Sequence, residues 1–163
     1  MTYDDYYREQ LKEGQEFQDF VAHELWHRLG IALVNYQSQK YQQGFGENES
    51  GWEIKYDKKR ATTGNLYIEV AEKAHPDNPN YVPSGIYRKD NTWMYCIGDY
   101  MVLYVFSKKW LVRAHRAKRY REPPETPTSR GFLIPEAEAR EAAVIVVRFG
   151  DAADLALVKG LGA

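Results

Sequence analysis

Two short segments constrain the fold most strongly, residues 52–57 (WEIKYD) and 66–73 (LYIEVAEK). Both alternate apolar and charged side chains, which is typical of β-strands with one face buried. Between them lies the turn-forming stretch 62–65 (TTGN), which predicts a tight β-hairpin. In such a hairpin Glu53 and Glu69 are expected nearly opposite each other.

The charged faces of these two strands predict a specific chemistry. Successive side chains of a strand point to opposite faces, so Glu53 shares a face with Lys55 and Asp57, and Glu69 shares one with Lys73. Two carboxylates at short range repel each other unless a divalent cation lies between them. A neighbouring ammonium group can orient a water molecule or stabilise a developing anion. The pattern therefore favours metal-assisted phosphodiester hydrolysis. The alternative is a solvent-exposed strand pair with cross-strand ion pairs.

The segment before these strands predicts a long helix. Phe17, Val21, Leu25 and Leu29 recur every four residues, which indicates one buried helical face over much of residues 4–29. Gly30 follows directly and fits a helix C-terminus.

The other expected elements complete an α/β fold with a central mixed sheet flanked by helices. They are a strand at 31–36, a polar loop at 37–51, strands at 92–96 and 100–106, a helix at about 107–120, a loop at 121–130, a helix from about 135, a strand at 143–149 and a short helix at about 152–159. The chain is expected to form a single domain over residues 1–163, with a core at about 14–120 and a C-terminal extension at 121–163.

A formal net charge of -1 excludes a uniformly basic coat for nucleic acid, so such binding must use a local patch. The expected helix at 107–120 offers one. Its cations are predicted to contact phosphates in a salt-dependent way, or to form an ordinary solvated face. The candidate residues are Lys108, Lys109, Arg113, Arg116, Lys118 and Arg119.

Two further features bear on location. The longest apolar runs have only strand length and no signal-like leader is visible, so no membrane association is expected. The single cysteine, Cys96, is expected to be a buried apolar residue and suits a reducing cytoplasm.

Residues 23–27 (HELWH) point to a different chemistry. The pattern H-E-x-x-H places two histidines one helical turn apart, where His23 and His27 can bind zinc and Glu24 can act as general base. It resembles the zinc helix of metzincin peptidases, although Leu33 stands where their third histidine is expected. A zinc metallopeptidase is thus one alternative. Otherwise the two histidines lie on a partly exposed helix flank.

The stretch 46–73, with GWEIKYD and TGNLYIE, followed by PSGI at 83–86, resembles the PD-(D/E)XK nuclease superfamily and its phage-type endonucleases. The resemblance covers about residues 14–120. It implies a restriction-endonuclease-like α-β-β-β-α-β core, with one acidic residue early in one strand and a (D/E)-x-K motif in the next.

The resemblance also implies metal ligands. Glu53 matches the first acidic residue, with Asp57 as a close rival, and Glu69 matches the acid of (D/E)-x-K. Glu16 resembles the helix glutamate that some members add to the metal site, with Glu24 as the alternative. The implied cofactor is Mg²⁺, for which Mn²⁺ can substitute.

The lysine of the motif is displaced in this chain. Ala71 stands in its position, so either Lys73 or Lys55 would supply the ammonium group. Glu47, in the preceding loop, either supports the site from outside the metal ligands or is simply exposed.

The implied activity is that of a Mg²⁺-dependent DNA endonuclease in a bacterial or phage-infected cell, acting on branched or repair-type DNA. The aromatic strands offer a face for a homodimer. The remaining alternative is a non-catalytic relative that binds nucleic acid.

Overall fold

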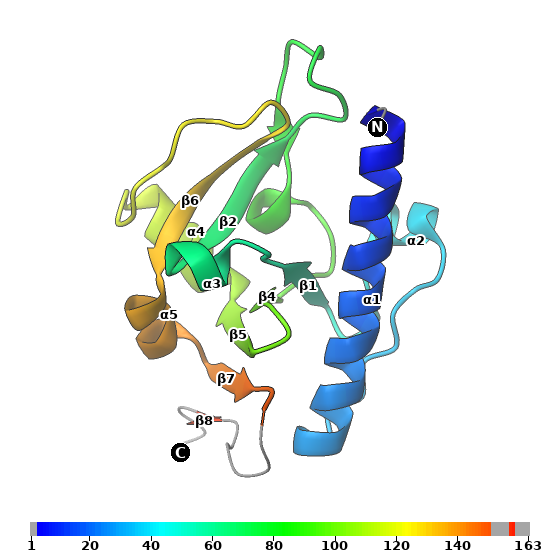
Figure 1. Ribbon diagram of the computed structural model, residues 1–163, viewed down its shortest axis with the longest axis vertical. Helices are drawn as coiled ribbons and strands as arrows, with labels where there is room; N and C mark the ends of the chain where they lie inside the picture. The colour runs from blue at the N-terminus through cyan, green and yellow to red at the C-terminus, as the bar shows by residue number, and fades with distance from the viewer. Residues whose placement is uncertain (1–2, 151–156, 159–163) are drawn as a thin grey trace.

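The computed structural model describes residues 3–150 and 157–158, which fold into a mixed α/β structure with two β-sheets (Figure 1). The helices are α1 (Tyr3–Leu29), α2 (Gln39–Phe45), α3 (Arg60–Thr63), the 3₁₀ turn η1 (Gly85–Tyr87), α4 (Lys108–Arg116) and α5 (Glu136–Ala142). The strands are β1 (Trp52–Tyr56), β2 (Asn65–Glu72), β3 (Val82–Pro83), β4 (Met94–Gly98), β5 (Val102–Ser107), β6 (Ser129–Pro135), β7 (Ile145–Arg148) and β8 (Leu157–Val158).

The larger sheet has the strand order β1-β4-β5-β7-β8, in which β1 runs parallel to β4 and the other pairs are antiparallel. Helix α1 lies beside β1 in Figure 1. Its predicted apolar stripe is confirmed, since Phe17, Val21 and Leu25 are fully buried in one core with Ile54 of β1. Gly30 ends the helix with a positive φ of 67°.

The smaller sheet has the order β3-β2-β6, and β2 pairs with β6 along its length. A second core contains side chains of both sheets, including Leu66 and Ile68 of β2, Phe132 of β6 and Tyr95 of β4. Helices α4 and α5 also contribute side chains to this core. The mixed central sheet was predicted correctly, but a helix covers one face and a second sheet lies against the other.

The predicted hairpin between residues 52–57 and 66–73 is wrong. Both segments are strands, but β1 pairs with β4, and β2 pairs with β3 and β6. The connection folds into α3 instead of a tight hairpin turn, and Gly64 ends it in the left-handed conformation with φ 65°. The helical turn carries the chain out of the first sheet and into the second.

Asp57 holds this connection together. Its Oδ1 accepts hydrogen bonds from the backbone N–H groups of Lys59 (3.0 Å) and Arg60 (3.1 Å), and its Oδ2 accepts one from Tyr67 (2.9 Å). A carboxylate that accepts backbone N–H groups at the start of a helical turn stabilises that turn. Asp57 thereby links β1, α3 and β2.

Residues 31–36 do not form the expected strand, apart from one bridge between Asn35 and Asn48. The reason lies at the open edge of β1, where side chains satisfy the backbone. The Asn48 amide bonds the N–H and the C=O of Trp52, at 3.0 and 2.7 Å. Within the predicted loop at 37–51, the structure contains α2.

The later elements follow the prediction with three differences. Strand β6 (Ser129–Pro135) was not predicted, and its first two residues fall in the expected loop at 121–130. Helix α4 ends at Arg116, before the predicted residue 120, and Lys118 adopts a positive φ of 50°. The short helix expected at 152–159 falls mostly outside the described residues, and the described pair Leu157–Val158 forms β8. The predicted helix after residue 135 and the strand within 143–149 are confirmed as α5 and β7. Over the described part of the chain, every helix is too short or too polar to cross a lipid bilayer.

The packing of α1 predicts a large effect of its buried aromatic residue. Phe17 is fully buried, and its ring stacks on Tyr56 with centroids 4.8 Å apart. Phe17→Ala is expected to lower the free energy of unfolding by about 3 kcal/mol, because it removes buried apolar surface and leaves a cavity. The neighbouring exposed residue provides the control: Glu16→Ala should change the value by less than about 0.5 kcal/mol. Urea denaturation measures both. Equal effects would contradict the burial of Phe17 between α1 and β1.

Candidate active site: an acidic cleft around Lys55

The alternation of β1 separates apolar from charged side chains. Ile54 packs toward α1, so Glu53 and Lys55 point to the opposite face of the sheet. Glu53 is fully buried, and its Oε1 lies 2.9 Å from Lys55 Nζ. Apart from this ion pair, neither oxygen of Glu53 has a hydrogen-bond partner in the described part of the chain. A buried carboxylate with unused acceptor capacity is costly unless another cation or donor completes it.

Glu47 joins this pair from the loop before β1. Its Oε2 accepts a hydrogen bond from the backbone N–H of Ile54 at 2.7 Å, and its Oε1 lies 3.9 Å from Lys55 Nζ. Burial raises the pKa of Glu47 to about 7, against the opposing effect of Lys55 and with reinforcement from Glu53. Glu47 is therefore near its midpoint of ionisation at neutral pH.

Strand β2 adds two more carboxylates, and a β-bulge between them brings both to one side. The register with β6 shifts between Glu69 and Ala71, which leaves Val70 as the extra residue. A bulge of one residue reverses the alternation that follows it. Glu72 thereby comes to the same side as Glu69, and the pKa of Glu72 is raised first by burial and then by Glu69. The expectation that Glu69, Ala71 and Lys73 share one face is wrong for this reason.

Two serine hydroxyls hold Glu69 in place. Ser84 Oγ donates to Glu69 Oε1 at 2.6 Å, and Ser129 Oγ donates to Oε2 at 3.0 Å. Gly85 permits the first contact, because a Cβ there would lie 2.3 Å from the Glu69 carbonyl oxygen and φ is +50°. The PSGI segment thus fixes the orientation of an acidic side chain.

Lys55 links these carboxylates electrostatically. Burial works against its charge, but Glu53 and Glu47 outweigh burial, and with a smaller contribution from Glu69 they hold the pKa of Lys55 well above its usual range. Together with Glu72, the carboxylates outnumber the two cations of the cluster, Lys55 and Arg88. The cluster has a surplus of negative charge when all of its acids are ionised.

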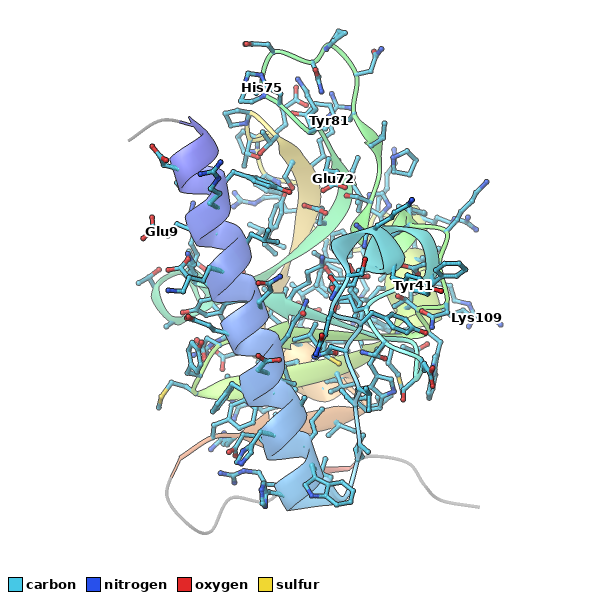
Figure 2. All side chains as sticks on the ribbon, turned by 90° about the vertical axis from the view of Figure 1, so that its right-hand side faces the viewer. Glu9, Tyr41, Glu72, His75, Tyr81 and Lys109 are labelled. Carbon is cyan, nitrogen blue, oxygen red and sulfur yellow. The ribbon has the colours of Figure 1, made fainter. Side chains whose placement is uncertain are left out.

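The cluster borders a cleft of about 310 Å³ between α1 and β1. In Figure 2, which looks onto this side, α1 and α2 flank the region and Glu72 lies between them. The cleft is lined by Tyr7, Gln10, Leu11, Gly14, Gln15, Gln18, Gln42, Glu47, Ile54, Lys55, Tyr56, Lys58, Glu72 and Arg88. Lys55 and Glu47 thus connect the buried Glu53 to a space that a ligand can enter.

The donors of this cluster match a hard divalent cation in chemistry. Carboxylate oxygens are the ligands that Mg²⁺ prefers, and Mg²⁺ is commonly held by one or two carboxylates, with water and substrate oxygens completing its shell. Glu53 offers unpaired oxygens for this purpose. Within the described residues, no group of three or more His, Cys, Asp or Glu side chains is already arranged to hold a metal. A bound ion would therefore be held chiefly by Glu53 and one neighbouring carboxylate.

Three other predicted site residues lie in other surroundings. Lys73 Nζ rests over the Tyr81 ring, 4.5 Å from its centroid. Glu16 pairs with Lys12 on the exposed side of α1 at 3.7 Å. The backbone hydrogen bonds described above account for the Asp57 side chain without a metal. Among the predicted residues, Lys55 pairs with Glu53 and interacts electrostatically with Glu69.

The HELWH segment lies in the C-terminal half of α1. The His23 and His27 rings are neighbours, with centroids 4.3 Å apart, and the His23 side chain is mostly exposed. Glu24 is bound to Arg28 at 2.6 Å, and this hydrogen bond lowers the pKa of Glu24. This geometry matches the exposed helix flank that was one of the two expectations. The zinc site stays a prediction.

The predicted basic patch is only partly free. Lys108 is mostly buried and donates to the Arg88 carbonyl oxygen (2.8 Å) and to Asp90 Oδ1 (3.1 Å). Arg119 lies over the Trp110 and Tyr120 rings and pairs with Glu138 at 3.5 Å. The exposed cations are Lys109, Arg113, Arg116, Lys118 and Arg119.

Sequence reasoning gave Glu47 only an indirect or exposed position and missed Glu72 and Arg88 altogether. One signal was available, because Glu53-Ile54-Lys55 itself has the form (D/E)-x-K. No local pattern announces the bulge at Val70 that moves Glu72 toward Glu69.

No protein-family model, no curated protein and no solved structure matches the chain.

The raised pKa of Glu47 predicts a pH-dependent stability. Between about pH 5 and 7 the folded chain keeps a proton on Glu47 that the unfolded chain has lost. The free energy of unfolding should therefore fall as pH rises through this range, by up to about 3 kcal/mol from this group. Glu47→Gln removes this contribution, so its pH dependence should be shallower. Urea denaturation from about pH 5 to about pH 8, with chelator present, measures the difference. Glu9→Gln, on the outer side of α1 (Figure 2), should follow the wild type. A Glu47→Gln curve parallel to the wild type would contradict the assignment.

Proposed function

We propose that this protein is a divalent-metal-dependent nuclease that hydrolyses phosphodiester bonds in DNA at the cleft around Lys55. The observation that carries the proposal is the fully buried Glu53 carboxylate, which has unused acceptor capacity beside Lys55. A surplus of acidic groups around one lysine at the edge of a cleft suits a hard divalent cation. Such a cation would in turn suit an anionic substrate.

The resemblance to the PD-(D/E)XK superfamily belongs to the same proposal, with a restriction-endonuclease-like core. In this interpretation Glu53-Ile54-Lys55 supplies the (D/E)-x-K motif, and Glu69 supplies the carboxylate from the neighbouring layer. Lys73 is then not needed to replace the motif lysine that is absent at Ala71. Support comes from Lys55, whose charge is stabilised by Glu53, Glu47 and Glu69.

A Mg²⁺ or Mn²⁺ ion held by Glu53 and Glu69 would lower the pKa of a bound water and neutralise charge on the phosphate. Lys55 orients the attacking water and stabilises the negative charge that develops on the phosphate oxygens. Glu47, with a pKa of about 7, is suited to accept the proton that this water loses. Glu47 Oε2 accepts the Ile54 N–H, so Oε1 is the oxygen that would take this proton.

The exposed face of α4 is the proposed contact surface for the DNA backbone. Lys109, Arg113 and Arg116 follow the spacing i, i+4 and i+7, so they form one exposed stripe. Lys108, on the same helix, bonds the Arg88 carbonyl oxygen, and Arg88 lines the cleft. The basic stripe is therefore attached to the segment that reaches the proposed site.

A cytoplasmic location in a bacterial or phage-infected cell, action on branched or repair-type DNA, and pairing as a homodimer are parts of this proposal. All three rest on the nuclease assignment, and evidence against that assignment would exclude them as well.

Substitution of Glu53 tests the proposed reaction directly. Glu53→Gln keeps the side-chain size but removes the buried negative charge, so Mg²⁺-dependent cleavage of branched or single-stranded DNA should fall at least about 100-fold. Lys55→Met should have a comparable effect. Gel analysis of single-turnover cleavage with Mg²⁺ or Mn²⁺ measures both.

The matched control is Glu9→Gln, which removes the same charge from the outer side of α1, away from the cleft (Figure 2). It should cleave at the wild-type rate. Retained folding of the Glu53 variant is checked by circular dichroism. If wild-type protein cleaves DNA and folded Glu53→Gln cleaves it equally well, the reaction takes place elsewhere.

The basic stripe predicts a salt-dependent binding defect. The double change Arg113→Ala and Arg116→Ala should weaken DNA binding for all sequences and reduce the slope of log affinity against log salt by about 2. Arg8→Ala with Lys12→Ala removes equal charge from exposed positions on α1 and should leave the slope unchanged. Fluorescence anisotropy at several salt concentrations measures both. An unchanged slope in the α4 variant would exclude this face as the contact surface.

A further inference from the structure

A row of aromatic side chains lies beside the cleft on α2 and the segment before it. The Tyr36 and Tyr41 ring centroids are 5.6 Å apart, and those of Tyr41 and Phe45 are 4.9 Å apart. Tyr41 and Phe45 are 53% and 58% exposed. Two large rings left in solvent side by side offer an apolar surface that usually meets a partner.

The row is joined to the proposed site by hydrogen bonds. The Tyr36 backbone N–H donates to the carbonyl oxygen of Glu47 at 2.8 Å. The Gln42 side chain, on α2, donates to the Tyr36 carbonyl oxygen and also lines the cleft. The aromatic row is therefore attached to the loop that carries Glu47 and to a residue that lines the acidic cleft.

The surroundings of the rings select the chemistry of the ligand. Helix α2 has the sequence QKYQQGF, with one lysine, amide side chains and no acidic residue. Lys40 is exposed next to Tyr41, whose side chain lies at the surface of α2 in Figure 2. Flat aromatic rings beside a cation suit the bases and phosphates of a nucleic acid strand. Bases in a duplex are stacked on one another, so only unpaired bases can lie on such rings.

We propose that Tyr41 and Phe45, supported by Tyr36, form a stacking site for unpaired bases on α2, the helix whose Gln42 lines the cleft. The inference rests on the proposed function and narrows its substrate to nucleic acid with a single-stranded segment, such as a flap, a gap or the arm of a branch. The rings bind bases of any sequence, because every base has an aromatic face.

The test measures binding without cleavage, using the full chain in buffer with chelator. The probes are a fluorescein-labelled oligothymidine of about 12 nucleotides and a labelled blunt duplex. Tyr41→Ala is expected to weaken binding of the single strand by about tenfold and binding of the duplex by less than about twofold. Phe45→Ala should act in the same direction.

Two further variants sharpen the result. Tyr41→Trp keeps an aromatic ring, so it should retain affinity, and the added tryptophan fluorescence should be quenched by the oligothymidine. Trp26→Ala removes another exposed aromatic side chain, on α1, and should leave the affinity for both probes unchanged.

Several results would overturn the stacking site: no binding of the single strand by wild type, an equal loss for both probes in Tyr41→Ala, or a Tyr41→Trp emission that the oligothymidine does not change. A change of sedimentation coefficient in Tyr41→Ala, with oligonucleotide affinity retained, would assign the rings to self-association and also exclude the proposal. Selective, Tyr41-dependent binding of single strands without any metal-dependent cleavage would support the stacking site and remove the proposed hydrolysis.

Discussion

The ion pair between Lys55 and the fully buried Glu53 is the interaction on which the rest of the candidate site depends. A carboxylate removed from water is tolerated only with a nearby positive charge or with hydrogen-bond donors. Lys55 supplies that charge and also faces Glu47, so one ammonium group serves several acids. The folded chain keeps these groups together because β1 is held between α1 and β4, with Ile54 buried on the side opposite the charges.

The remaining acids are brought in by irregular backbone. The bulge at Val70 turns Glu72 toward Glu69, and Gly85 allows the Ser84 hydroxyl to reach Glu69. Bulges are common beside functional sites because they change the direction of a side chain while the strand stays paired in the sheet. The result is a local excess of negative charge in a partly enclosed space, which regular strands of this composition would have spread over two faces.

Hydrogen bonds connect the basic stripe of α4 and the aromatic row of α2 to two short segments. Each of these segments carries a residue that lines the cleft. The segment with Arg88 is bound by Lys108 of α4, and the segment with Glu47 is bound by Tyr36. Cations that contact phosphates and rings that stack on bases act at different parts of a nucleotide. Both surfaces are thus bonded to segments that carry a residue of the cleft, Arg88 or Glu47, which supports the nuclease proposal.

Local pattern determined that residues 52–57 and 66–73 form strands and that residues 4–29 form a helix with one apolar stripe, because these features depend on side-chain periodicity within one element. It also placed Glu53 and Lys55 on one face and named Glu69. Pairing was decided only by the tertiary structure. Asp57 and Gly64 close a helical turn in place of a hairpin, so β2 enters a second sheet and meets Glu53 from another layer. The burial that raises the pKa of Glu47, and the bulge that redirects Glu72, arise from contacts between segments distant in the chain. Such contacts leave no signal in the spacing of nearby residues.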